Sequence, residues 1–136
     1  MQIQEININQ KVLITGGGSG IGLALAKKFL SHNNTVIITG RNLAKLEKVK
    51  ADLPGIHIFQ SDVTSDPEVR KLADDLEQKF GGIDVLINNA GAIALMGVES
   101  TSLKQYDLIQ TINHRATFIC AQAALPFLKQ SENPHI

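Results

Sequence analysis

The chain has 136 residues, of which 43% are hydrophobic and 19% are charged, so its composition is that of a soluble globular protein. This length suits a single domain. Thirteen basic residues balance thirteen acidic ones, which excludes the basic excess typical of nucleic-acid-binding proteins. A net charge near zero also permits self-association.

The sequence carries no sign of an exported, membrane-bound or metal-binding protein. Cys120 is the single cysteine, so no intramolecular disulfide or cysteine zinc site can form, which fits a reducing compartment. Residues 1–10 lack the basic and apolar regions of a secretory signal, and no apolar run approaches the roughly 20 residues that span a bilayer. The histidines show no metal-ligand spacing. We therefore expect a cytoplasmic protein with no membrane, nucleic-acid or metal partner.

The first half of the chain alternates short β-branched runs with helical periodicities. The first run leads directly into glycines, and Pro54-Gly55 ends the second helical stripe. In chain order, the predicted elements are a strand at 11–14, a helix at 20–31, a strand at 35–39, a helix at 43–53 and a strand at 57–60.

The second half continues this alternation. A helix opens at residues 65–68, either with a Ser-x-x-Glu capping box or with an Asp cap followed by Pro, and Gly81-Gly82 ends it. A strand follows at 84–88, and Ser102-x-x-Gln105 caps a long helix whose apolar face runs to Phe127. Pro126 should kink or shorten this helix. Residues 133–136 are typical of a loop that enters a fifth strand.

Strict alternation of strands and helices indicates a parallel sheet, and right-handed crossovers favour the strand order 3-2-1-4. We therefore predict an α/β fold with one dinucleotide-binding domain over residues 1–136. It would be a Rossmann-type doubly wound parallel sheet, truncated after the fourth strand and its following helix. In such a chain the fourth strand has no partner on its outer edge, so we expect poor stability or self-association through that edge and the long helix.

The strongest motif is the glycine-rich segment Thr15-Gly16-Gly17-Gly18-Ser19-Gly20-Ile21-Gly22, between the first strand and the first helix. Backbone N–H groups at the positive end of a helix accept a pyrophosphate, and glycines allow the phosphate to approach the backbone. The spacing is Gly-x-x-x-Gly-x-Gly, which differs from the more widespread Gly-x-Gly-x-x-Gly. An isolated glycine cluster would indicate only a turn. Its place in the first βα unit favours dinucleotide binding.

The end of the second strand indicates which dinucleotide binds. An NAD site needs a carboxylate about 20 residues past the glycines, where it binds the ribose 2′-hydroxyl. That place holds Gly40 and Arg41, and no acidic residue occurs before Glu47. Arg41 can donate charge-assisted hydrogen bonds to a 2′-phosphate, a contact worth roughly 1.5–3 kcal/mol, or about 10- to 150-fold in affinity. We predict NADP(H) as the cofactor. The alternative is that Arg41 is a solvated residue at a helix start.

Four motifs, in order along the whole chain, resemble the short-chain dehydrogenase/reductase family: the glycine segment, Asp62-Val63, Asn88-Asn89-Ala90-Gly91 and Asn113. The resemblance implies a structural and catalytic role for Asn113 and a preference for NADP(H) from an arginine just after the second strand. Together with the Arg41 argument, it makes the following residues the expected cofactor-binding set: Thr15, Gly16, Gly18, Ser19, Gly20, Ile21, Gly22, Arg41, Asp62, Val63, Asn89, Ala90 and Gly91.

Each of these matches has a plainer structural explanation as well. Asp62 is also a common turn or cap residue, and the asparagines of the 88–91 motif can satisfy neighbouring backbone groups. Asn113 is unfavourable within a helix, and a side-chain bond across to the fourth strand would explain it. His114 lacks a partner spaced to orient it, and Cys120 reads as core. The lysines at 27, 28, 45, 48 and 50 are most simply solvated.

The resemblance also implies catalytic groups that this sequence lacks. Members of the family protonate the substrate carbonyl with a tyrosine, assisted by a lysine four residues later and a serine. The single tyrosine, Tyr106, precedes Asn113 and is followed four residues later by Gln110. The catalytic serine, tyrosine and lysine would therefore lie beyond Ile136. We expect the 136 residues alone to be inactive.

Three hypotheses for the function follow. The first is the cofactor-binding segment of an NADP(H)-dependent oxidoreductase, which transfers hydride between nicotinamide and a carbonyl or alcohol substrate. The alternative is a non-catalytic NADP(H)-binding module, and the third is a structural remnant that binds nothing. Family habit and the exposed long helix favour a homo-oligomer.

Overall fold

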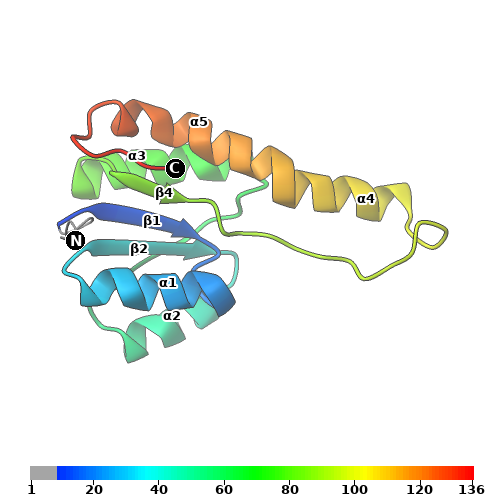
Figure 1. Cartoon of the computed structure of the whole chain (residues 1–136), viewed down its shortest axis with the longest axis horizontal. Coiled ribbons are helices and arrows are strands. Elements are labelled where there is room, and N and C mark those ends of the chain that lie inside the picture. Colours follow the sequence, from blue (N-terminus) through cyan, green and yellow to red (C-terminus); the bar gives the residue numbers. More distant parts are fainter. Residues whose placement is uncertain (1–8) are drawn as a thin grey trace, which may run out of the picture.

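Four parallel strands form one sheet in the order β3-β2-β1-β4 (Figure 1). The structure is a computed structural model that describes residues 9–136. The expected absence of a secretory signal concerns residues 1–10, and most of these lie outside the described residues. The elements in chain order are β1 (Lys11–Thr15), α1 (Gly20–Ser31), β2 (Thr35–Gly40), α2 (Leu43–Asp52), β3 (His57–Gln60), α3 (Asp66–Phe80), β4 (Val85–Ile87), α4 (Leu103–Gln110), the π-helical segment η1 (Thr111–Arg115) and α5 (Ala116–Leu128).

The predicted strand order is confirmed, and it places β1 inside the sheet. Val12 of β1 lies opposite Val36 of β2 on one side and opposite Val85 of β4 on the other. β3 pairs with the far side of β2. Because the strands are parallel, their carboxyl ends meet at one edge, and the glycine segment after β1 lies between the ends of β2 and β4.

The helices form a layer on each face of the sheet, with α1 and α2 on one face and α3 and α5 on the other (Figure 1). Successive strand residues point to opposite faces, so both faces of the strands are buried and apolar. The core on the α1 and α2 side contains Val12, Ile14, Val36, Ile38, Ala26, Leu46 and Val49. The core on the other side contains Leu13, Ile37, Leu86, Val69, Leu72, Leu76, Ile119, Cys120 and Ala124.

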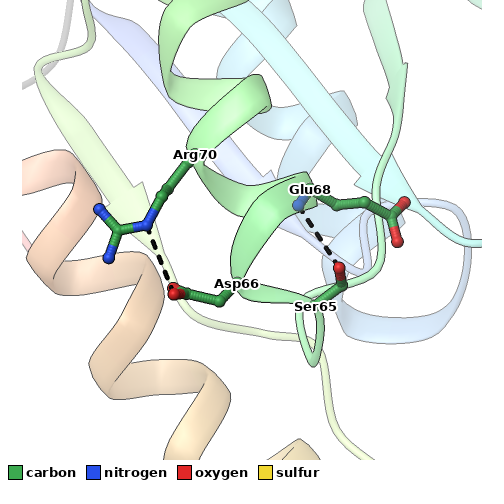
Figure 2. A network of polar contacts seen from close by, with 4 residues as sticks. All are labelled: Ser65, Asp66, Glu68 and Arg70. Atoms are coloured by element: carbon green, nitrogen blue, oxygen red, sulfur yellow. Dashed lines mark hydrogen bonds and ion pairs between the residues drawn. The ribbon is translucent and has the colours of Figure 1, made fainter.

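The start of α3 resolves the two predicted capping arrangements in favour of serine. The Ser65 hydroxyl accepts a hydrogen bond from the Glu68 N–H at 3.4 Å, as Figure 2 shows. The Glu68 carboxylate does not complete a capping box, because it accepts from the Asp62 N–H at 3.3 Å instead. Asp66 pairs with Arg70 at 3.4 Å on the exposed side of the helix. The start of α3 is thereby tied to the loop that follows β3.

The long predicted helix is present, but it is interrupted by one π-helical turn. Its capping box is confirmed, since the Ser102 hydroxyl accepts from the Gln105 N–H and the Gln105 side chain accepts from the Ser102 N–H. The predicted apolar face holds only from α5 onward: Ala116 and Ile119 are buried, whereas no residue of α4 is buried. The reason is visible in Figure 1, where α4 extends past the end of the sheet. Pro126 lies in the last turns of α5.

The prediction of an unpartnered outer edge on β4 is wrong at one position. His135 accepts a hydrogen bond from the Leu86 N–H at 3.0 Å and donates its own N–H to the Asp84 carbonyl at 3.1 Å. Val85 and His135 form a parallel bridge. This contact confirms that residues 133–136 lead into a fifth strand position beside β4.

Cys120 gives a test of the packing between the sheet and α5. Burial raises the pKa of its thiol to about 11 from a usual 9.0, and only the thiolate reacts with alkylating agents. At pH 8 we therefore expect iodoacetamide to modify the native chain about 100-fold more slowly than the urea-unfolded chain, as followed by mass spectrometry. Equal rates in the two states would show that α5 does not seal this core.

Candidate functional site

A cleft of about 770 Å³ opens at the carboxyl ends of the strands. Ligands bind at this place in doubly wound sheets, next to two neighbouring strands whose following helices lie on opposite faces of the sheet. Among the residues predicted to bind a cofactor, the following line it: Gly16, Gly18, Ser19, Arg41, Asp62, Val63, Asn89, Ala90 and Gly91. Thr15 is buried beneath the glycine segment, Gly20, Ile21 and Gly22 begin α1, and Asn113 lies on η1.

The glycines are needed for two separate reasons. Gly16 and Gly20 have φ angles of +65° and +54°, a region that side chains rarely adopt. A Cβ at Gly16 would also lie 2.9 Å from the Ala90 Cα, and one at Gly22 would overlap the Asn89 amide. Gly17, absent from the predicted set, packs so closely on Ile38 that a Cβ would overlap that side chain. The segment therefore folds as a strand-to-helix turn with bare backbone against the cleft.

The start of α1 lies beside the cleft, which Gly18 and Ser19 line. Its N-cap residue, Ser19, makes no side-chain capping hydrogen bond. In contrast, Asn42, Ser65 and Ser102 each accept a backbone N–H at the start of α2, α3 and α4. The first N–H groups of a helix lack partners within it and lie at the positive end of its dipole. The glycine turn and the uncapped helix start thus fit a pyrophosphate.

The Asn88-Asn89-Ala90-Gly91 motif holds the glycine segment in place through hydrogen bonds. The Thr15 hydroxyl accepts the N–H groups of Asn89 and Ala90, both at 3.1 Å, and donates to the Ile87 carbonyl at 3.4 Å. The Asn89 side-chain amide donates to the carbonyls of Thr15 and Gly16, both at 3.0 Å. The structural reading of this motif therefore holds for Asn89. Asn89 also lines the cleft, so one residue both supports the glycine segment and forms part of the cleft wall.

Asp62 is held as an ionised acceptor on the wall of the cleft that follows β3. Its Oδ1 accepts the Thr64 hydroxyl at 2.7 Å and the Thr64 N–H at 2.9 Å. Burial by itself would raise the pKa of Asp62, but these two bonds and the charge of Arg41 outweigh it, so the pKa lies below its usual value. The turn reading of Asp62 is thus correct, and it leaves the carboxylate facing the cleft.

The end of β2 contributes the cations of the cleft. Arg41 lines it, and so does Lys45 of α2, which is exposed, as expected for a solvated lysine. Within residues 9–136, both ion pairs lie on α3, so neither cation has a carboxylate within 4.0 Å there. The lining contains one acidic residue, Asp62. This part of the cleft therefore favours an anionic ligand.

Two buried hydroxyls in the cleft wall escaped the sequence reasoning. The Oγ1 of Thr39 and the Oγ of Ser61 have no hydrogen-bond partner among the described residues, although both residues line the cleft. Buried polar atoms without partners are rare and indicate a ligand or water nearby. Their position at the ends of β2 and β3 was the available signal, since ligands bind at strand ends in this type of sheet.

Asn113 secures the loop that leaves β4. Its Oδ1 accepts the Ala92 N–H at 2.8 Å, and its Nδ2 donates to the Ala92 carbonyl at 2.6 Å. The expected bond to the fourth strand is therefore wrong, because the partner is the loop beyond it. Ala92 lines the cleft, so the hydrogen bonds from Asn113 hold the cleft wall at Ala92 in place. π-Helical turns often occur at functional sites.

Other candidates do not join this arrangement. Tyr106 is half exposed on α4, and His114 lines a shallow groove on the outer face of α4 and α5 with Asp107, Arg115 and Phe118. Between residues 9 and 136, no three His, Cys, Asp or Glu residues are placed to hold a metal ion. In that same part of the chain, no helix is long and apolar enough to cross a membrane.

Thr15 offers a test of the hydrogen bonds that hold the glycine segment in place. Thr15→Val keeps the side-chain shape but leaves the N–H groups of Asn89 and Ala90 without their acceptor, at about 1–3 kcal/mol for each buried donor. We expect urea unfolding to show a loss of this order in the free energy of unfolding. Thr15→Ser, which keeps the hydroxyl, is the matched control and should lose far less. Wild-type stability of Thr15→Val, or a loss no larger than that of Thr15→Ser, would contradict the role of the hydroxyl.

Comparisons with known proteins agree with this geometry. An uncharacterized oxidoreductase of Staphylococcus aureus is 33% identical over 126 residues, which are 91% of this chain and 54% of that protein. Hydroxysteroid dehydrogenase-like protein 2 of Mus musculus is 33% identical, over 92% of this chain and 28% of that protein. The chain thus spans about half the length, or less, of these curated relatives.

Solved structures show the same fold. A putative short chain dehydrogenase from Pseudomonas syringae superposes with a TM-score of 0.89 at 28% identity, over 98% of this chain and 57% of its own. The Pseudomonas aeruginosa RhlG/NADP active-site complex superposes with a TM-score of 0.88 at 27% identity, over 96% and 52%. The sequence model of the short chain dehydrogenase family matches residues 10–136. The chain belongs to the short chain dehydrogenase family, and its sheet has the Rossmann-like topology of the family's solved structures.

Proposed function

We propose that this chain is the NADP(H)-binding segment of an oxidoreductase that transfers hydride between nicotinamide and a carbonyl or alcohol substrate. The position of Arg41 carries the proposed preference for NADP(H). Arg41 borders the cleft and forms no ion pair within residues 9–136. Gly40 stands beside it, at the place where an NAD site has a carboxylate. A carboxylate at that place would bind the ribose 2′-hydroxyl of NAD and repel a 2′-phosphate. The NADP in the RhlG complex supports the same choice.

Three groups of residues in the cleft would each bind a different part of the cofactor. The glycine turn and the start of α1, from Gly16 to Gly22, would hold the pyrophosphate. The Asp62 carboxylate, with Val63, would receive the adenine, and Asn89, Ala90 and Gly91 would form the wall toward the nicotinamide. Bound NADP(H) supplies the hydride chemistry. Asn113 would act by holding Ala92 in place, as its two hydrogen bonds suggest.

The 136 residues by themselves would bind the cofactor without turning over a substrate. Tyr106 has Gln110 four residues later instead of lysine, and its half-exposed side chain does not line the cleft. Of the family's catalytic residues, Asn113 is the one present in this sequence. The same observation favours the second candidate, a binding module without catalysis, and both candidates require NADP(H) to bind in the cleft.

Self-association through the outer face of α4 and α5 is part of this proposal. Contiguous exposed apolar side chains often mark protein interfaces. Phe118 is 65% exposed and lines the shallow groove together with the polar and charged residues Asp107, Gln110, Thr111, His114 and Arg115. The large apolar side chains exposed on the two helices are Leu103, Tyr106, Leu108, Phe118 and Leu125.

Substitution of Arg41 tests the cofactor preference. Arg41→Asp removes the cation and supplies a carboxylate for the ribose, so we expect NADPH affinity to fall about 10- to 150-fold and NADH affinity to rise. Titrations followed by the fluorescence of the reduced nicotinamide measure both. An unchanged ratio of the two affinities would refute the role of Arg41. Absence of saturable binding in the wild type would leave the structural-remnant hypothesis.

Substitution of Phe118 tests the proposed interface. Phe118→Glu replaces an exposed aromatic side chain with a charge, so the chain should sediment as a smaller species than the wild type at equal concentration. Lys129→Glu, on an exposed residue just after α5, is the control for the added acid. A wild-type chain that sediments as a monomer at every concentration would contradict self-association.

A further inference from the structure

Lys45 reaches the cleft from the first turn of α2. Its backbone N–H donates to the Asn42 side chain at 3.0 Å, so the helix cap fixes where the side chain starts. Its Cγ and Cδ lie 3.8 Å from the position that a Cβ on Gly18 would take. The aliphatic stem therefore runs from α2 toward the glycine segment, along the cleft edge that it shares with Arg41.

The two cations border the same cleft, and neither forms an ion pair among residues 9–136. Asp62, the single carboxylate of the lining, is engaged through its Oδ1 by Thr64. A dianion between the glycine segment and the end of β2 would therefore meet two positive charges.

We propose that Lys45 is a second specificity-determining residue, which binds the 2′-phosphate of the cofactor together with Arg41. This inference rests on the proposed function. With the pyrophosphate at Gly18 and Ser19 and the adenine at Asp62, the ribose between them would present its 2′ position to Gly40 and Arg41. Lys45 lines the same cleft as Arg41, and its aliphatic stem lies beside Gly18. A lysine ammonium binds a phosphate as a point charge and gains much less from a neutral hydroxyl.

The test compares NADPH and NADH, which differ only in the 2′-phosphate, on the full 136-residue chain. Lys45→Gln should weaken NADPH binding about 10-fold, as expected for one charge-assisted contact, and leave NADH binding within about 2-fold. Lys45→Arg keeps the positive charge, so this variant should bind NADPH nearly as tightly as the wild type does. Lys48→Gln is the matched control, because Lys48 is an exposed lysine of the same helix that does not line the cleft.

The outcomes separate this inference from the proposed function. If the wild type binds neither cofactor, or binds both equally, the proposed preference fails, and the inference fails with it. If the wild type prefers NADPH and Arg41→Gln reduces that preference, but Lys45→Gln does not, the role of Lys45 alone is overturned. Equal weakening of NADPH and NADH by Lys45→Gln would place the lysine at the pyrophosphate and would also overturn it. Thermal unfolding of each variant checks that the fold is retained.

Discussion

The hydrogen bonds between Thr15 and Asn89 join the carboxyl ends of β1 and β4, two segments that lie far apart in the sequence. Both strands stop there, so their last backbone groups lack partners in the sheet and need others. One threonine hydroxyl and one side-chain amide provide them, and in doing so they set the distance between the glycine turn and the wall at Ala90 and Gly91. A side chain at Gly16 or Gly22 would occupy the space that these hydrogen bonds require.

The cleft that results has two chemically different ends. One is built from the bare backbone of the glycine segment and the start of α1, where Ser19 makes no side-chain cap and no charged side chain is needed to attract an anion. The other combines the cations of Arg41 and Lys45 with the ionised carboxylate of Asp62, whose pKa is held down by Thr64 and Arg41 despite its burial. The glycine segment follows β1, the two cations follow β2 and Asp62 follows β3, so the sheet order decides that these groups meet.

The π-helical turn extends this arrangement outward. Asn113 lies on η1 at the junction of the buried α5 and the protruding α4, and its two bonds to Ala92 tie the helix to the loop that leaves β4 (Figure 1). An asparagine in a regular helix is unfavourable, so its presence is explained by a partner outside the helix. The same junction marks where the helix leaves the support of the sheet, since α4 has no buried residue.

The sequence alone determined the order and type of the main strands and helices, the strand order, the glycine turn and the Ser102 cap, because periodicity and capping depend on residues close together in the chain. The partners across elements were decided by the tertiary structure. Glu68 bonds to Asp62 instead of Ser65, and Asn113 reaches the loop instead of the strand. The physical reason is that each of these contacts joins a helical residue to a loop outside its own helix, and only the packing of the helices on the sheet establishes that distance.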